Sequence, residues 1–394
     1  MVKYTSLPLL FFFLASLLGV FLRWQFILPT PGINYTYFLH AHSHTMFLGW
    51  VFNALYLGFI ITYIKKGEQK IFKTIFLVLQ LLVVAMMISF PLQGYGLYSI
   101  LFSTLHTLLA LVFIVIFFRK TSNIETVSCW FGRTALLFFT LSTIGPFSLG
   151  YLMANGLGQS QWYYFSIYYY LHFQYNGFFL FGVLSLFFQL LEEKQIALNV
   201  QKAKAVGQWM AVACIPAYLL SVLWAKPGII FNMISAIAGV IQLYALVLFF
   251  YLLKKIPIQS NFSKPAFFSF GIGLLAFSLK ILLQSFSAHP AIANFAYEFR
   301  PIVIAYLHLV LIGIISVVVL GWYIEKNFIR QKLAGKTVAA FLITFTGTQI
   351  GLILQPWWNE VSPYIILSSS QFLALFSVLL SICCFCFFLL HQKP

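Results

Sequence analysis

Charged residues are scarce in this sequence of 394 residues, and aspartate is absent altogether. Only 8% of the residues are charged and 62% are hydrophobic, whereas a soluble domain carries about 25% charged residues. This composition excludes an ordinary soluble fold. The alternating pattern of outer-membrane β-barrel strands is also absent, and lipid-exposed backbone outside a barrel must be hydrogen-bonded within each helix. The sequence therefore predicts an all-α polytopic membrane protein.

Cysteine is sparse and carries no metal-binding pattern. Cys129 and Cys214 are isolated, whereas Cys383, Cys384 and Cys386 lie together in the last apolar run. No pair has the spacing of a zinc or iron–sulfur ligand set, and no disulfide framework is indicated. We expect these residues to pack as small hydrophobic side chains.

Long apolar runs recur along the chain, each close to the length of about 20 residues that a helix needs to cross a bilayer. The runs cover residues 7–28, 38–64, 71–91, 97–118, 133–155, 163–191, 205–224, 229–253, 266–287, 302–324, 337–355 and 364–390. No soluble domain is visible between them. We therefore expect a bundle of twelve transmembrane helices that forms a single domain over residues 1–394.

The basic residues are distributed unevenly between the two sides of this expected bundle. Nineteen Lys and Arg residues fall on the side that holds both chain termini, and only Arg23, Lys226 and Arg300 fall on the other side. Because cytoplasmic loops are enriched in Lys and Arg, we expect cytoplasmic termini and a location in the bacterial inner membrane. Topology thus explains the net charge of +16. We expect membrane lipid, and no nucleic acid, as a partner; the oligomeric state is left open.

Histidine is the ionisable residue that recurs inside the apolar runs, in the second, fourth, sixth and tenth of them. The residues are His40, His42, His44, His106, His172 and His308. Ionisable side chains are costly at membrane depth, so they usually face a site or the protein interior. All six lie in the expected outer half of the membrane. Since imidazole binds iron and copper alike, the pattern predicts a layer of haem or metal ligands; the alternative is a set of buried histidines bonded to neighbouring carbonyl groups.

Helical spacing divides the histidine cluster of the second run. His40 and His44 are four residues apart and share one face, whereas His42 points elsewhere, along a stripe that continues through Met46 and Gly49. A glycine beneath a histidine would let a flat ring approach the helix, which favours His42 as an axial haem ligand. His40 and His44 would then bind a second metal, or one of them would donate a hydrogen bond to a haem propionate.

The second axial ligand must come from another helix at a similar depth, and His308 is the best candidate. His172 is the candidate ligand for a second metal, assisted by His106 or by the histidines of the second run. Arg23 and Arg300, near the outer ends of their helices, would neutralise the haem propionates, because a guanidinium group binds carboxylates in a bidentate manner. The alternative role for both arginines is ordinary snorkelling at the membrane interface.

The placement of these histidines resembles subunit I of the haem-copper oxidase superfamily, which includes the nitric oxide reductases. His42 followed by Met46 is similar to the haem ligand motif of helix 2 in that family. The resemblance implies that His308 is the other low-spin haem ligand and that His172 is a copper ligand. The seventh run has no histidine pair, and Tyr306 stands where the family has a further histidine. We therefore do not expect a complete oxygen-reducing centre.

Short motifs are also similar to those of the NnrS family, described as twelve-helix haem- and copper-containing membrane proteins associated with nitric oxide stress. The residues from His42 to Trp50 resemble its His-x-His-x-Met-x-x-Gly-aromatic pattern. Leu171, His172 and Tyr175 resemble its Leu-His-x-x-Tyr pattern, and the stretch that begins at His308 resembles its late histidine–glycine pattern.

These features together predict a haem-binding membrane protein in electron transfer or in nitric oxide or oxygen handling, with a quinol or a cytochrome as electron donor. The haem type, the presence of copper and catalytic turnover are left open. One alternative is an active nitric oxide or oxygen reductase with an atypical metal site. Others are a transporter whose histidines line a path and a membrane scaffold with incidental histidines.

Overall fold

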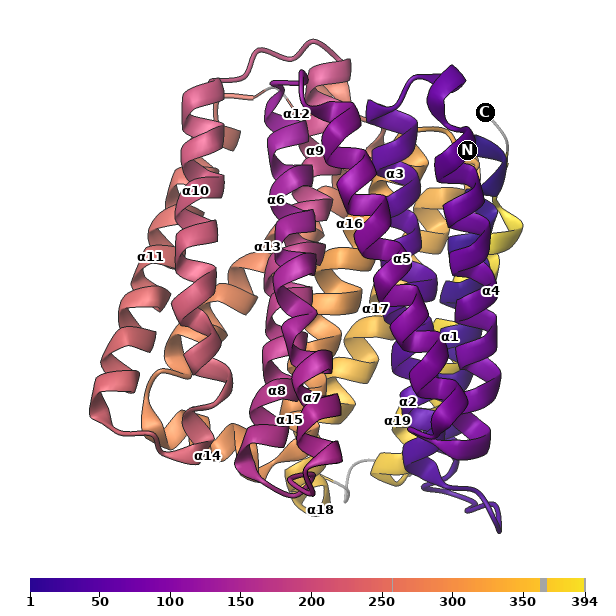
Figure 1. The fold of residues 1–394 in the computed structure, drawn as a ribbon, viewed down its shortest axis with the longest axis vertical. Helices are drawn as coiled ribbons and strands as arrows, with labels where there is room; N and C mark the ends of the chain where they lie inside the picture. Colours follow the sequence, from indigo (N-terminus) through magenta and orange to yellow (C-terminus); the bar gives the residue numbers. More distant parts are fainter. Residues whose placement is uncertain (257, 362–366, 393–394) are drawn as a thin grey trace. The chain divides into compact units, whose positions relative to one another are not determined.

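The computed structural model describes residues 1–256, 258–361 and 367–392. It is 85% helical, and no β-strand occurs in the described residues. The expected fold class is therefore confirmed: the chain is an all-α polytopic membrane protein (Figure 1). Helices satisfy every backbone hydrogen bond locally, which is the requirement that the bilayer interior imposes.

The described residues form a succession of helices with few other elements. The α-helices are α1 (Ser6–Trp24), α2 (Tyr35–His44), α3 (Asn53–Tyr63), α4 (Lys70–Gln93), α5 (Leu97–Thr121), α6 (Val127–Ser142), α7 (Ile144–Ala154), α8 (Gln161–His172), α9 (Leu180–Glu193), α10 (Val200–Ala217), α11 (Ile229–Leu253), α12 (Ile258–Asn261), α13 (Lys264–Phe286), α14 (Pro290–Glu298), α15 (Arg300–His308), α16 (Val317–Glu325), α17 (Gln331–Leu354), α18 (Trp358–Val361) and α19 (Ser369–Leu389). The π-helices are η2 (Thr45–Phe52), η4 (Phe173–Phe179) and η7 (Leu309–Ser316). The 3-10 helices are η1 (Val2–Tyr4), η3 (Lys66–Glu68), η5 (Tyr218–Ser221), η6 (Leu223–Ala225) and η8 (Gln355–Trp357).

Twelve helical stretches in the described part of the chain are long and apolar enough to cross a membrane, which confirms the expected number. They are Val2–Trp24, Tyr35–Tyr63, Lys70–Gln93, Leu97–Thr121, Val127–Ala154, Gln161–Glu193, Val200–Ser221, Ile229–Leu253, Lys264–Phe286, Arg300–Glu325, Gln331–Glu360 and Ser369–Leu389. Several spans join consecutive elements, as α8, η4 and α9 do. The chain is a multi-pass membrane protein.

Helix ends depart from the expected runs where a polar side chain caps the helix. The run expected from residue 133 begins at Val127, because Thr126 Oγ1 accepts a hydrogen bond from the backbone N–H of Cys129 (3.2 Å). The last span begins at Ser369 and not at 364, since Ser368 forms a capping box with Gln371; residues 362–366 lie outside the described chain. Hydropathy locates the apolar segment, whereas capping groups decide where a helix begins.

The chain divides into two compact units. Unit 1 contains Met1–Ser122, Ser263–Ser269 and Val319–Pro394, and unit 2 contains Asn123–Phe262 and Phe270–Val318. The expected single domain and the cytoplasmic position of both termini remain predictions.

Unit 1 packs around the span formed by α2, η2 and α3. Helix α1 contacts η2 and α19, while α4 contacts both α2 and α5. Trp50, which is fully buried, stacks on Phe12 with ring centroids 4.5 Å apart. Asn53 and Gln80 exchange two amide hydrogen bonds of 2.7 and 3.0 Å. This satisfied polar pair joins the η2 span to α4 within an apolar core.

Unit 2 is centred on the span formed by α8, η4 and α9. Helix α6 packs against both α9 and η4, and α10 runs beside α11 (Figure 1). Gly177 in η4 allows the closest of these approaches. A Cβ atom at this position would lie 2.5 Å from Phe138 Cβ, so a larger residue would force α6 away from η4.

Two spans each end in a glutamate that binds the beginning of the preceding span. In unit 2, Glu192 accepts hydrogen bonds from the backbone N–H (2.9 Å) and the hydroxyl of Ser128. In unit 1, Glu325 accepts hydrogen bonds from the backbone N–H (3.0 Å) and the hydroxyl (2.8 Å) of Ser263. The same arrangement therefore recurs in two parts of the chain and fixes the ends of the helices that carry it.

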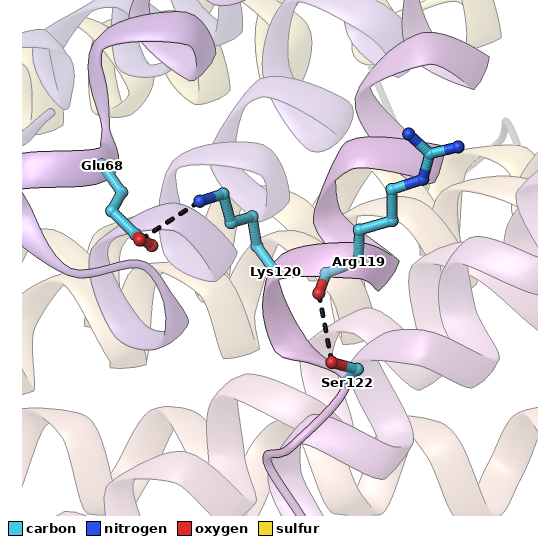
Figure 2. Close-up of polar contacts among 4 residues, drawn as sticks. All are labelled: Glu68, Arg119, Lys120 and Ser122. Atoms are coloured by element: carbon cyan, nitrogen blue, oxygen red, sulfur yellow. Dashed lines mark hydrogen bonds and ion pairs between the residues drawn. The ribbon is translucent and has the colours of Figure 1, made fainter.

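A surface ion pair fastens the connection between α3 and α4. Lys120 Nζ, at the end of α5, lies 3.1 Å from Glu68 Oε1, and Figure 2 shows the Arg119 side chain pointing away from this pair. The hydroxyl of Ser122 donates to the backbone carbonyl of Arg119 (3.2 Å) and closes the end of the helix. Both ion-pair partners are more than 40% exposed, so the pair contributes at most about 1 kcal/mol of stability.

Candidate cofactor site

Three of the twelve spans change from α to π geometry directly after a histidine. The segment η2 follows His44, η4 follows His172 and η7 follows His308. Every residue of the three segments is buried, and they are the only π-helical elements in the described residues. Since π turns are rare and frequently occur at functional sites, this coincidence singles out the same three spans as the histidine pattern does.

In unit 1, His40 and His44 lie on one face of α2, as the helical spacing predicts. Both rings contact Phe90 and Tyr95; the shortest centroid distances are 4.5 Å for His40 with Tyr95 and 4.3 Å for His44 with Phe90. His44 Nδ1 lies 2.9 Å from the carbonyl oxygen of His40. Because a carbonyl can only accept, Nδ1 carries the proton and the neutral ring keeps its lone pair on Nε2, as in a metal-ligating histidine.

His42 points toward α1 and is oriented in the same way. Its Nδ1 donates to the carbonyl oxygen of Ala15 (2.8 Å), and its Cε1 lies 3.2 Å from the position of a Cβ added at Gly19. The space over Gly49 is filled by Phe11, whose Cβ would be 2.9 Å from an added Cβ. Gly49 therefore serves the packing of α1 on η2, and the expected approach of a flat ring over it is not what the structure provides. Met46 is buried in the same segment.

His106 on α5 is the least satisfied of the membrane histidines. It is fully buried, and neither ring nitrogen has a hydrogen-bond partner. The ring meets Phe52 edge to face at 5.2 Å and lies within electrostatic range of His44. A buried polar group without a partner costs about 1–3 kcal/mol. Unit 1 thus holds the neighbouring pair His40 and His44 and the unpartnered His106.

In unit 2, His172 uses both of its ring nitrogens. Nε2 donates to the carbonyl oxygen of Cys214 (2.8 Å), and Nδ1 accepts from the side-chain amide of Asn176 (3.0 Å). The ring is fully buried, and Asn176 Oδ1 has no partner. His172 would have to release Asn176 before its Nδ1 lone pair could bind a metal.

His308 ends α15, and its Nδ1 donates to the carbonyl oxygen of Ile304 (2.8 Å). Two residues earlier, Tyr306 contacts Tyr175 with ring centroids 6.4 Å apart. The segments η4 and η7, which follow His172 and His308, also contact each other within unit 2.

The two expected propionate ligands differ in their surroundings. Arg23 is half-buried in unit 1 and lies within electrostatic range of His42 and Tyr35. Arg300 is exposed at the start of α15 in unit 2 and lies within electrostatic range of Tyr168. Each arginine is thus associated with a span that carries a predicted axial ligand, Arg23 with His42 and Arg300 with His308.

Across residues 1–256, 258–361 and 367–392, no group of three or more His, Cys, Asp or Glu side chains lies close enough together to hold a metal ion. A haem iron takes only two axial ligands, because the porphyrin supplies the others. Haem ligation does not require such a group.

Sequence reasoning missed two features of this region. One is the π geometry after the histidines, which hydropathy does not distinguish from α geometry. The other is Lys280 on α13, which is only 3% exposed. A single lysine inside an apolar run was visible in the sequence, but its burial depends on how α13 packs.

No protein-family model matches this chain, and a comparison with curated proteins finds no match to it.

Proposed function

We propose that this chain is a haem-binding protein of the bacterial inner membrane, with a role in electron transfer or in the handling of nitric oxide or oxygen. The observation that carries the proposal is the transition to π geometry directly after His44, His172 and His308. Where a span departs from the α-helix, its backbone and side chains are re-aimed, which is a recurrent feature of functional sites.

The hydrogen bonds of the imidazole rings support the proposal. His42, His44 and His308 each donate Nδ1–H to a backbone carbonyl at 2.8–2.9 Å. Such a bond fixes the tautomer, orients the ring and raises the basicity of Nε2. We propose His42 and His308 as axial haem ligands, and His172 as the ligand of a second metal, with His40, His44 or His106 assisting.

When bound, the haem would supply reversible one-electron chemistry at iron. The protein would contribute the axial imidazoles. Arg23, near His42, would neutralise one propionate, and Arg300 would neutralise the other.

The direct test is to express the chain in a haem-sufficient bacterium, purify it in detergent and measure its haem and copper content. We expect a Soret band and at least one haem per chain. His289→Gln is a matched control, because His289 lies outside the spans and only caps α14; it should bind the same amount of haem. A colourless protein without haem or copper would contradict the proposal.

A further inference from the structure

A pocket of about 360 Å³ lies in unit 2, where the connection from α9 to α10 meets the end of α11. The connection and the first turn of α10 contribute Leu198, Asn199 and Lys202 to its lining, while the end of α11 and the residues after it contribute Tyr251 and Lys255. Asn199 Oδ1 accepts a hydrogen bond from the backbone N–H of Lys202 (2.9 Å), which caps the turn that carries this lysine. Two helices that pack against each other thus each bring a basic side chain to the pocket.

The two lysines of the pocket are held at one aromatic ring. Lys202 Nζ lies 4.6 Å and Lys255 Nζ lies 4.9 Å from the centroid of the Tyr251 ring. An aromatic face attracts a cation at such distances but leaves its charge in place. Neither lysine forms an ion pair with another residue of the described chain. The pocket therefore concentrates two positive charges without a counter-charge, in a volume typical of small-molecule sites, which measure about 300–1,000 Å³.

The carboxylates closest to the pocket in the sequence are engaged elsewhere. Glu192, at the end of α9, accepts hydrogen bonds from the backbone and the hydroxyl of Ser128. Glu193 accepts a hydrogen bond from the side-chain amide of Gln189. These two glutamates therefore fasten helix ends within unit 2 and do not neutralise the lysines of the pocket.

An exposed aromatic pair lies on α10 and α11 two turns away from the pocket. Trp209 follows Lys202 by seven residues on α10, and Tyr244 precedes Tyr251 by seven residues on α11. Each is therefore about 10 Å from the pocket along the same side of its helix. The two rings meet edge to face with centroids 5.5 Å apart, and both side chains are exposed. The charged pocket thus continues into an aromatic surface on two membrane-spanning helices.

We infer that this pocket binds the phosphate group of an anionic phospholipid, with an acyl chain lying against Trp209 and Tyr244. The two ammonium groups supply the charge that a phosphodiester requires, and basic pockets between transmembrane helices are typical sites for anionic headgroups. The aromatic pair favours a lipid over free phosphate, which has no chain to cover it. The inference goes beyond the proposed function and does not depend on haem, because none of these residues is a proposed haem ligand.

The test uses the full-length protein, purified in detergent and freed of endogenous lipid, with dioleoyl phosphatidylglycerol added at constant ionic strength. Unfolding is followed by intrinsic fluorescence. We expect the melting temperature to rise by about 2 °C when the lipid exceeds its dissociation constant about tenfold. Dioleoyl phosphatidylcholine has the same chains without the net charge, and inorganic phosphate has the charge without the chains. Neither should reproduce the rise.

Substitutions of single lysines separate a site from general surface charge. Lys202→Met and Lys255→Met should each reduce the response to phosphatidylglycerol, and the double variant should abolish it. Lys254→Met is the matched control, because Lys254 is exposed beside Lys255 but does not line the pocket; it removes the same charge and should respond as the parent does. The double variant Lys202→Arg/Lys255→Arg keeps both charges and should retain the response.

Native mass spectrometry keeps the test decisive if a methionine variant folds poorly. The parent protein and the double arginine variant should each retain one phosphatidylglycerol after release from detergent, and the double methionine variant should retain none. A parent protein that responds equally to both lipids, or that responds to inorganic phosphate as it does to phosphatidylglycerol, would overturn the inference. So would a Lys254→Met variant that loses as much of the response as Lys255→Met.

Discussion

At the scale of single residues, backbone carbonyl groups control how the histidines present their ring nitrogens. His42 and His44 stand two residues apart, yet one donates to the carbonyl of Ala15 on α1 and the other to the carbonyl of His40 on its own helix. Both bonds leave Nε2 as the acceptor. His172 differs, since its Nε2 is the donor. Which ring nitrogen is free to bind a metal thus depends on the hydrogen bond that each histidine donates, and not only on its depth in the membrane.

Removing one member of the Asn53–Gln80 amide pair should destabilise unit 1. Asn53→Leu leaves the buried amide of Gln80 without its partner, and we expect a loss of about 1–2 kcal/mol in unfolding free energy. Denaturation in mixed detergent micelles measures it. The double variant Asn53→Leu/Gln80→Leu removes both amides, so its loss of unfolding free energy should be smaller than the summed losses of the two single variants. A loss equal to or larger than that sum would show that the two amides do not act as a pair.

Gly177→Ala should destabilise unit 2 through overpacking. The added Cβ would lie 2.5 Å from Phe138 Cβ, and strain of this kind typically costs about 1–3 kcal/mol. Gly150→Ala is the matched control, because nothing lies within 4 Å of a Cβ added there and alanine is the better helix former. Thermal unfolding of both variants checks the prediction, which fails if Gly177→Ala melts at or above the parent temperature.

At the scale of elements, the number of spans could be predicted from the sequence, whereas their internal geometry could not. Twelve apolar runs gave twelve helical stretches, because the bilayer permits little else. The π segments required tertiary information: η2, η4 and η7 are as apolar as the α-helical turns around them, so hydropathy does not distinguish the two. The role expected of Gly49 failed for a related reason, since only packing reveals that Phe11 fills the space over it.

Deleting one residue from a π segment should disrupt the proposed site while leaving the span in place. A π turn behaves as an α-helix with one extra residue, so removing Ile312 from η7 would rotate His308 by about 100° relative to α16. We expect membrane insertion to persist and the Soret band to be lost. Deleting Gln159, which is exposed between α7 and α8, is the control and should leave the band intact. An unchanged spectrum after the Ile312 deletion would mean that η7 does not aim the histidine.

At the scale of the whole molecule, the distribution of basic residues predicts the orientation. Nineteen of the Lys and Arg residues lie on the side of both termini and three on the other. A reporter fluorescent only in the cytoplasm should therefore be fluorescent at the C-terminus, and a periplasm-dependent phosphatase should be active when inserted after Gly228 but inactive when inserted after Lys255. Phosphatase activity at Lys255 would require the opposite orientation.

The candidate site could be located from the sequence only as a set of spans. Histidines in four runs indicated the spans in which we expect ligands, and the structure places His40 and His44 on one face of α2 against Phe90 and Tyr95. It also gives His172 two hydrogen-bond partners within unit 2. Asn176 stands four residues later, where helical spacing allows the contact, whereas the contact with the Cys214 carbonyl depends on packing. The sequence shows Lys280 as an isolated charge within an apolar run, but its burial depends on how α13 packs.

The most direct measurement of the central claim is the reduced-minus-oxidised visible spectrum of the purified protein, recorded with an electron paramagnetic resonance spectrum of the oxidised form. The account predicts a six-coordinate, low-spin bis-histidine haem that is lost in His42→Ala and in His308→Ala and is retained in His289→Gln. A low-spin haem that survives both alanine substitutions, in protein that remains folded, would contradict the assignment of these two residues as axial ligands.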